Sequence, residues 1–189
     1  MAPPESICDR SRISDTRLRP QADAASPGAG ILTGDGGDRV RTGSTPDIIS
    51  SDKVLRFYRL WLSRCNGGRL PKKSDMDPIE MRAFLSSIVL TKVHYDPLDF
   101  EYRIIGEDVI ARLGNMTGKR VRRSALIDAS SSAYQNYCAV VESRAPQFLE
   151  GMAVTAFRRD RPYLLSRVHC PLSSDGETID YVISCLTFL

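Results

Sequence analysis

The sequence lacks any apolar run of the roughly 18 residues that a membrane-spanning helix needs. Its N-terminus also lacks the apolar core of a secretory signal peptide. We therefore expect a cytoplasmic protein that makes no membrane contact. The formal net charge of +3 is too small to attract a partner at long range, so charge alone indicates no ligand class.

Sequence patterns typical of metal sites and of disulfide-bonded proteins are also missing. The chain has two histidines, and its five cysteines are an odd number without any C-x-x-C pair. These features argue against a disulfide-stabilised fold and against a structural zinc site. We expect free, buried thiols and no metal.

No arrangement of a nucleophile and a base is visible, and the G-x-S-x-G pattern is absent. Helix capping and turn formation account for the closely spaced aspartates of 75–77 and 96–99. The sequence therefore predicts a protein that is not an enzyme.

Residues 1–49 are rich in Pro, Gly, Ser, Asp and Arg and show no apolar periodicity. Such a segment buries too little surface to offset its ordering entropy, so we interpret it as a disordered N-terminal tail. Its positive and negative charges are interspersed, which argues against a nucleic-acid-binding arm. Residues 50–189 have enough apolar material for one domain.

Apolar spacing and turn residues predict an α+β domain. Its expected elements are a helix at 52–65, a helix starting at 77 and reaching 88, strands at 87–95 and 100–106, a short helix at 107–113, a longer helix at 130–144, and strands at 146–157, 162–172 and 178–188. The short connections between the last three strands predict antiparallel pairing.

The last strand is apolar on both sides, which predicts that both faces of its sheet are covered. One side of this strand carries Ile179, Tyr181, Ile183 and Cys185, and the other side carries Val182, Leu186 and Phe188. The amphipathic helix at 52–65, or a second copy of the chain, is expected to cover the outer face. The residues predicted for this helix or dimer interface are Tyr58, Trp61, Leu62, Val182, Leu186 and Phe188.

Three stretches carry a family resemblance: YRLWLSRCNGGRLPKKSDMDPIEMRAFLSSIVLTKV, DFEYRIIGEDVIARLGNMTGK and CPLSSDGETIDYVISCLTF. Through them the chain resembles the small stand-alone PAS-like family of alphaproteobacteria, over nearly all of 54–189. The resemblance implies a five-stranded antiparallel sheet with helices on one face, which closes a small cavity, and an N-terminal amphipathic helix on the other. In PAS domains the cavity binds a small molecule or is filled by side chains, while the outer face mediates dimerisation.

The resemblance leaves the cofactor unknown. Haem is disfavoured because the helix before the third strand has Tyr134, Tyr137 and Cys138 where a haem-binding PAS domain has a histidine. Flavin is disfavoured because the N-C-R-F-L-Q phrase of light-oxygen-voltage photosensors is absent.

Five residues are the candidates for lining a ligand cavity: Tyr134, Tyr137, Cys138, Arg167 and His169. The last two lie on an otherwise apolar strand. Polar groups there either face solvent or serve as directional groups in a cavity. His94, at a strand end, is expected to be exposed.

Two basic clusters could hold an anion, although decoration of a loop and a hairpin turn is the favoured explanation. The anion-binding candidates are Arg120, Arg122, Arg123, Arg158 and Arg159. Aromatic interleaving of the kind that stacks bases is absent around the first cluster, and Phe157 and Tyr163 beside the second fit strand packing. Both observations argue against nucleic acid as a partner.

The leading hypothesis is a non-catalytic signalling or regulatory PAS module that forms a homodimer. A ligand or partner would shift the packing of its N-terminal helix or dimer interface, and the output would pass to a separate protein. The alternative is a ligand-free scaffold for dimerisation or docking. A third hypothesis, an enzyme on the same sheet, requires a polar cluster inside the cavity.

Overall fold

The computed structural model describes residues 41–121, 132–154 and 163–189. Within them lies one six-stranded sheet in the order β1-β4-β5-β6-β2-β3, and every neighbouring pair is antiparallel. The strands are β1 (Arg41–Gly43), β2 (Ile88–Tyr95), β3 (Leu98–Ile105), β4 (Gln147–Val154), β5 (Tyr163–Leu172) and β6 (Tyr181–Phe188). The helices are α1 (Asp52–Arg64), α2 (Glu107–Leu113) and α3 (Ser132–Ser143), with short 3-10 turns at Pro46–Ile48, Lys73–Asp75 and Leu85–Ser87.

The predicted α+β class is confirmed. The opening hairpin of β2 and β3 joins the closing strands through β6, since Ile88 pairs with Cys185 and Lys92 with Tyr181. The five predicted strands are all present, and this is the arrangement that the PAS resemblance implied. No helix in the described ranges is both long and apolar enough to span a bilayer.

The sixth strand corrects the predicted boundary of the folded domain. β1 pairs with β4, with Thr42 opposite Leu149. Ile48 and Ile49, which follow β1 in the sequence, are buried. Folded structure therefore begins at least nine residues before the predicted start at 50, and only the part of the predicted tail at 1–40 lies outside the described residues. Edge pairing with a strand about one hundred residues away leaves no local signal in the sequence.

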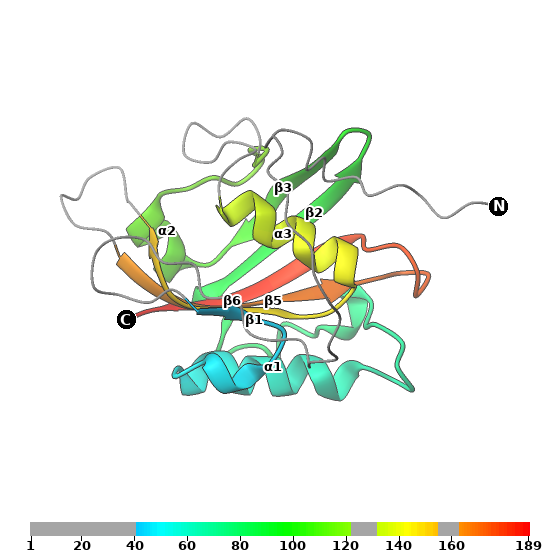
Figure 1. Ribbon diagram of the computed structural model, residues 1–189, viewed down its shortest axis with the longest axis horizontal. Helices are drawn as coiled ribbons and strands as arrows, with labels where there is room; N and C mark the ends of the chain where they lie inside the picture. The colour runs from blue at the N-terminus through cyan, green and yellow to red at the C-terminus, as the bar shows by residue number, and fades with distance from the viewer. Residues whose placement is uncertain (1–40, 122–131, 155–162) are drawn as a thin grey trace, which may run out of the picture.

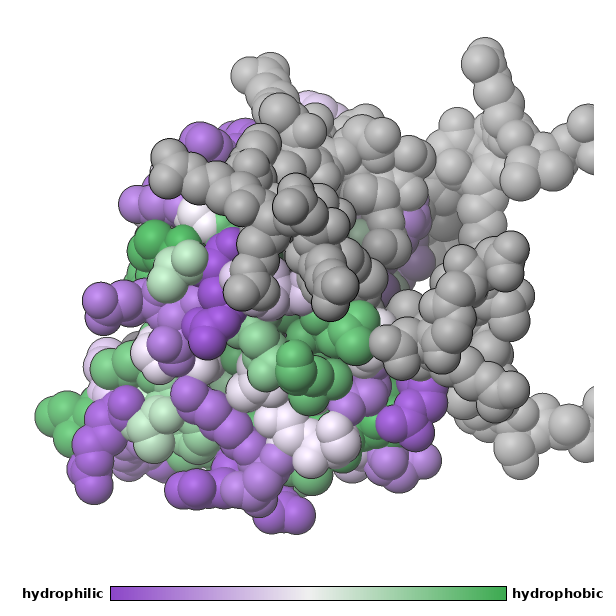
Figure 2. Space-filling view, turned by 90° about the vertical axis from the view of Figure 1, so that its left-hand side faces the viewer, coloured by the Kyte–Doolittle hydropathy of each residue, from purple (hydrophilic) through white to green (hydrophobic). Residues whose placement is uncertain are grey.

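Helix α1 covers one face of the sheet (Figure 1). Ser51 caps it by accepting the Val54 amide at 3.4 Å, and the helix ends before Gly67, which has a positive φ of 58°. The Trp61 indole N–H donates to the Pro171 carbonyl of β5 at 3.0 Å. Figure 2, viewed toward one end of the molecule, shows hydrophilic residues along much of the lower edge, with hydrophobic ones between them. Val54, Phe57 and Trp61 of α1 are buried, whereas Asp52, Arg56 and Arg59 are exposed. The helix is thus amphipathic, as predicted.

Helices α2 and α3 lie on the opposite face of the sheet (Figure 1). Gly114 ends α2 with a φ of 85°, a positive value that glycine adopts without strain. The two faces bury separate apolar clusters: one joins α2, α3 and the sheet, and the other joins α1, the segment before β2 and the sheet. The prediction that both faces of the sheet are covered is confirmed.

The predicted helix at 77–88 is wrong. Asp77 does accept the Ile79 amide at 2.8 Å, as a helix cap would, but the chain then forms turns and a single 3-10 turn. Met81 and Phe84 are buried under α1, whereas Leu85 is 43% exposed. Tertiary packing of the buried pair, including an edge-to-face contact between Phe84 and Phe57, replaces the local helical pattern.

Val182, Leu186 and Phe188 of the last strand were predicted to face α1 or a second copy of the chain, and this prediction is also wrong. Val182 and Leu186 are buried in the α3-side cluster, and Phe188 packs against that cluster. Ile183 and Cys185 face α1 instead. Alternation correctly separates the two sets, but both are apolar, so the pattern does not show which helix covers which set. Of the residues predicted on α1, Tyr58 and Trp61 face the sheet, and Leu62 is 48% exposed.

Candidate functional site

The predicted cavity residues come together beneath α3. Tyr134, Tyr137 and Cys138 are buried on the face of α3 that meets the sheet, and they contribute to the α3-side cluster. Arg167 and His169 are buried on β5, so the interpretation that they face solvent is wrong. The Tyr137 ring lies 4.5 Å, centroid to centroid, from the His169 ring. The five candidates therefore belong to one helix–sheet interface.

His169 is the centre of a polar group inside this apolar layer. Its side chain is fully buried, and its Nδ1 lies 2.5 Å from the Ser184 Oγ of β6. Nearby, the Thr91 hydroxyl lies 3.3 Å from the Tyr137 hydroxyl. Within the described part of the chain, the His169 Nε2 has no hydrogen-bond partner. Either tautomer thus leaves one buried donor or acceptor of the ring unused.

Arg167 places a cation in the same layer, close enough to Tyr102 and Tyr137 to interact electrostatically. Burial lowers the pKa of Arg167, and the two tyrosines oppose that shift. Burial raises the pKa of Tyr102, and the neighbouring Tyr137 adds to the effect. Burial, followed by the charge of Arg167, lowers the pKa of His169 well below its usual value. The imidazole is therefore neutral at physiological pH, and its ring nitrogens can donate and accept.

A pH titration tests this assignment. The native state does not protonate His169 near pH 6, whereas the unfolded chain does so below about pH 6.5. Unfolded chains then bind more protons, so falling pH destabilises the fold by up to about 1.4 kcal/mol per unit between about pH 6.5 and pH 5. The His169→Asn variant keeps a polar group near Ser184 but cannot titrate at this position. It should therefore lack the part of the acid destabilisation that His169 causes.

The measurement is urea unfolding of both proteins at several pH values. The difference between their free energies of unfolding isolates His169, because every other titrating group is shared. A difference that stays constant from pH 7 to pH 5 would contradict a buried neutral imidazole.

The Ser184–His169 pair has the composition of a nucleophile and its base, and the cluster supplies the polar interior that an enzyme on this sheet would require. Both side chains, however, are fully buried. In the described ranges no carboxylate bonds the second ring nitrogen to orient the base. The pair is better explained as a bond between neighbouring strands, in which Ser184 fixes the orientation of the ring.

Other candidate chemistry in the described ranges is limited. No group of three or more His, Cys, Asp or Glu side chains gathers there to hold a metal ion. Cys138, Cys170 and Cys185 are buried free thiols, as predicted, and Cys65 is half-buried. Burial raises the pKa of Cys185 to about 12 and that of Cys170 well above its usual value, so these thiols are unreactive.

The anion-binding candidates are only partly described. Arg120 is half-buried, and its backbone forms an isolated antiparallel β-bridge with the backbone of Glu101 in β3. Arg122, Arg123, Arg158 and Arg159 lie outside the described residues. Their role in anion binding stays a prediction.

The polar group also contains Thr91, Tyr102 and Ser184, which were not predicted from the sequence. A signal was available for Ser184, which falls between Val182 and Leu186 on the same side of an apolar strand. His94, predicted to be exposed, is partly buried and lies 2.9 Å from a Glu101 carboxylate oxygen.

No protein-family model matches the chain, and no curated protein matches it. A solved structure described as a fungal LOV domain photoreceptor resembles it with a TM-score of 0.41 and 13% sequence identity. The match covers 62% of this chain and 94% of the fungal one.

Proposed function

We propose that this protein is a non-catalytic sensor or regulatory module of the PAS type, which binds a small molecule beneath α3. The observation that carries the proposal is the fully buried His169, whose Nε2 has no partner within the described residues. An unsatisfied buried polar atom costs about 1 to 3 kcal/mol, so its retention needs a compensating role. Hydrogen bonding to a ligand supplies that role.

The surroundings of His169 favour a ligand with a polar or anionic group and a flat apolar body. Arg167 provides a cation, and the rings of Tyr137 and Phe100 lie 5.0 Å apart in a stacked arrangement beside it. In a layer that excludes water, a charge-assisted hydrogen bond is stronger than at the surface.

The sheet offers a physical route from this site to α1. Successive residues of β5 face opposite sides: Arg167 and His169 face α3, while Val168 and Cys170 pack into the α1-side cluster. Directly after them, the Pro171 carbonyl accepts the Trp61 indole N–H. A ligand that moves His169 would therefore change the packing of α1, which could present a different surface to a partner or to a second copy of the chain.

The experiment combines a ligand screen with the fluorescence of Trp61, which is the only tryptophan. Native mass spectrometry of freshly purified protein, and a thermal-shift screen of small aromatic and anionic metabolites, should identify a compound that raises the melting temperature. Its binding should change the emission of Trp61. His169→Phe should weaken binding at least about tenfold, because a hydrogen bond in a buried site is lost.

His94→Phe is the matched control, because it removes the other histidine, which lies outside the polar group. It should bind as the wild type does. A compound that binds equally well to His169→Phe would contradict the site, and a compound that binds without changing Trp61 emission would contradict the coupling. A protein that retains no small molecule, responds to none and dimerises would favour the ligand-free scaffold.

A further inference from the structure

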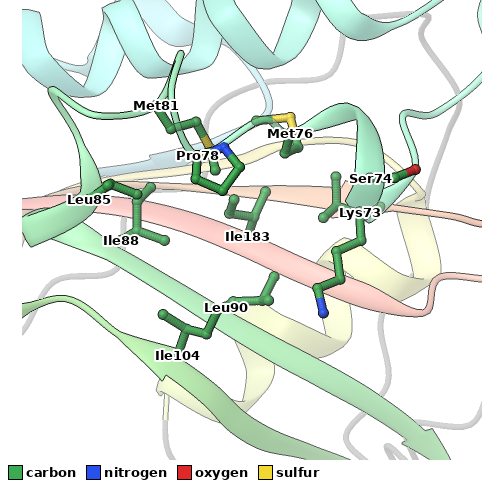
Figure 3. Close-up of a pocket in the computed structure, with 11 residues that line it drawn as sticks. Lys73, Ser74, Met76, Pro78, Met81, Leu85, Ile88, Leu90, Ile104 and Ile183 are labelled. Atoms are coloured by element: carbon green, nitrogen blue, oxygen red, sulfur yellow. The ribbon is translucent and has the colours of Figure 1, made fainter.

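A cavity lies on the face of the sheet opposite α3, between the segment that precedes β2 and the strands. Its volume is about 500 Å³, and its lining is almost entirely apolar. Figure 3 shows Met76, Pro78 and Met81 on the side of that segment, facing Leu90 and Ile183 on the strands. The other lining residues are Lys73, Ser74, Leu85, Ile88, Ile104 and Leu172.

The segment at 73–87 borders the cavity, and its residues from 77 onward form turns in place of the predicted helix. Its two 3-10 turns, at Lys73–Asp75 and Leu85–Ser87, flank a run of turns that leaves part of the sheet uncovered. Ile104 of β3 is 53% exposed at the rim. A hollow of this size with apolar walls lies in the range typical of small-molecule sites, and the methionines can adapt to the shape of a ligand.

One cation belongs to this apolar lining. The Lys73 ammonium lies 5.1 Å from the centre of the Tyr181 ring, and no described carboxylate forms an ion pair with it. The nearby Asp75 carboxylate accepts the Lys72 amide at 2.9 Å and does not line the cavity. The site thus combines an apolar body with a single positive charge.

We propose that this cavity binds a small amphipathic carboxylate, with the alkyl or aryl body against Met81, Ile183 and Ile104 and the carboxylate on Lys73. The volume fits a small molecule, and the lone lysine selects an anionic head group. This proposal is independent of the proposed function, because the polar group around His169 lies on the α3 side of the sheet.

Decanoate and decanol are suitable probes, because they share the apolar chain and differ in the charge of the head group. Calorimetric titration should show saturable binding of decanoate, about tenfold tighter than that of decanol. Lys73→Met keeps an unbranched side chain without the charge, so it should weaken decanoate binding about tenfold and leave decanol binding unchanged. Ile104→Arg, which places a bulky charged group at the exposed rim, should abolish both.

Lys72→Met is the matched control, because Lys72 is an exposed neighbour that does not line the cavity. It should bind decanoate as the wild type does. Equal affinity for both probes, or unchanged binding of decanoate to Lys73→Met, would overturn the assignment of the lysine.

Two further results would overturn the site itself. One is the absence of decanoate binding together with a dimer that Ile104→Arg converts to a monomer, which would show that a second copy fills the cavity. The other is decanoate binding that His169→Phe abolishes and Ile104→Arg leaves intact, which would place the ligand beneath α3.

Discussion

Replacing Phe57 with Ala should lower the free energy of unfolding by about 3 to 5 kcal/mol. Phe57 is fully buried between α1 and the sheet, and its ring meets that of Phe84 edge-to-face with the centroids 5.6 Å apart. The substitution removes this contact and leaves a cavity that neighbouring side chains only partly fill. Because alanine is a good helix former, α1 itself should persist, and the loss would measure packing.

Leu62→Ala is the control for this prediction, since Leu62 lies on the same helix but is 48% exposed. Its expected cost is below about 1 kcal/mol. Chemical denaturation followed by circular dichroism gives both values. A cost for Phe57→Ala no larger than that for Leu62→Ala would show that α1 does not pack on the sheet as described.

Gly106→Ala should destabilise the protein by about 3 kcal/mol, although its φ of −68° suits any residue. A Cβ at this position would lie 2.4 Å from the carbonyl oxygens of Leu85 and Ser86. The Gly106 amide also donates to the Ile88 carbonyl at 2.7 Å, which holds the start of α2 against the start of β2. Backbone atoms cannot move away as a flexible side chain could, so the two segments would have to separate.

Gly43→Ala is the matched control, because its Cβ would meet the Ile48 Cδ1 at an ordinary 3.7 Å. We expect a change within about 0.5 kcal/mol. Thermal and urea unfolding of both variants measure the difference. Equal stability of the two variants would contradict the close approach at Gly106.

Strong local signals account for the parts of the fold that the sequence predicted. The α1 helix has a serine cap and an apolar stripe. The three closing strands are apolar runs that short polar stretches of the sequence separate, so each element is specified by its own residues. The turn segment at 77–88 shows the limit of this reasoning. Its apolar spacing suits a helix, but burial of Met81 and Phe84 under α1 decides its shape.

The sequence predicted several residues of the candidate site, but it did not predict that they are buried beneath α3. Arg167 and His169 stand out as polar residues on an apolar strand, yet alternation does not distinguish a solvent-facing side from one covered by α3. The partners Thr91 and Ser184 come from other strands. Their proximity depends on long-range register, which the sequence pattern does not contain.

The central position of β5 has an evolutionary consequence. Every residue from Leu165 to Leu172 is buried, and the two sides of the strand belong to different layers. No position in this stretch can drift as a solvent-facing strand residue does, so a saturation-mutagenesis profile should be uniformly intolerant there. The exposed side of β3, by contrast, should accept many substitutions at Arg103. Adaptation of this domain to new partners would then proceed through the helices and the sheet edges.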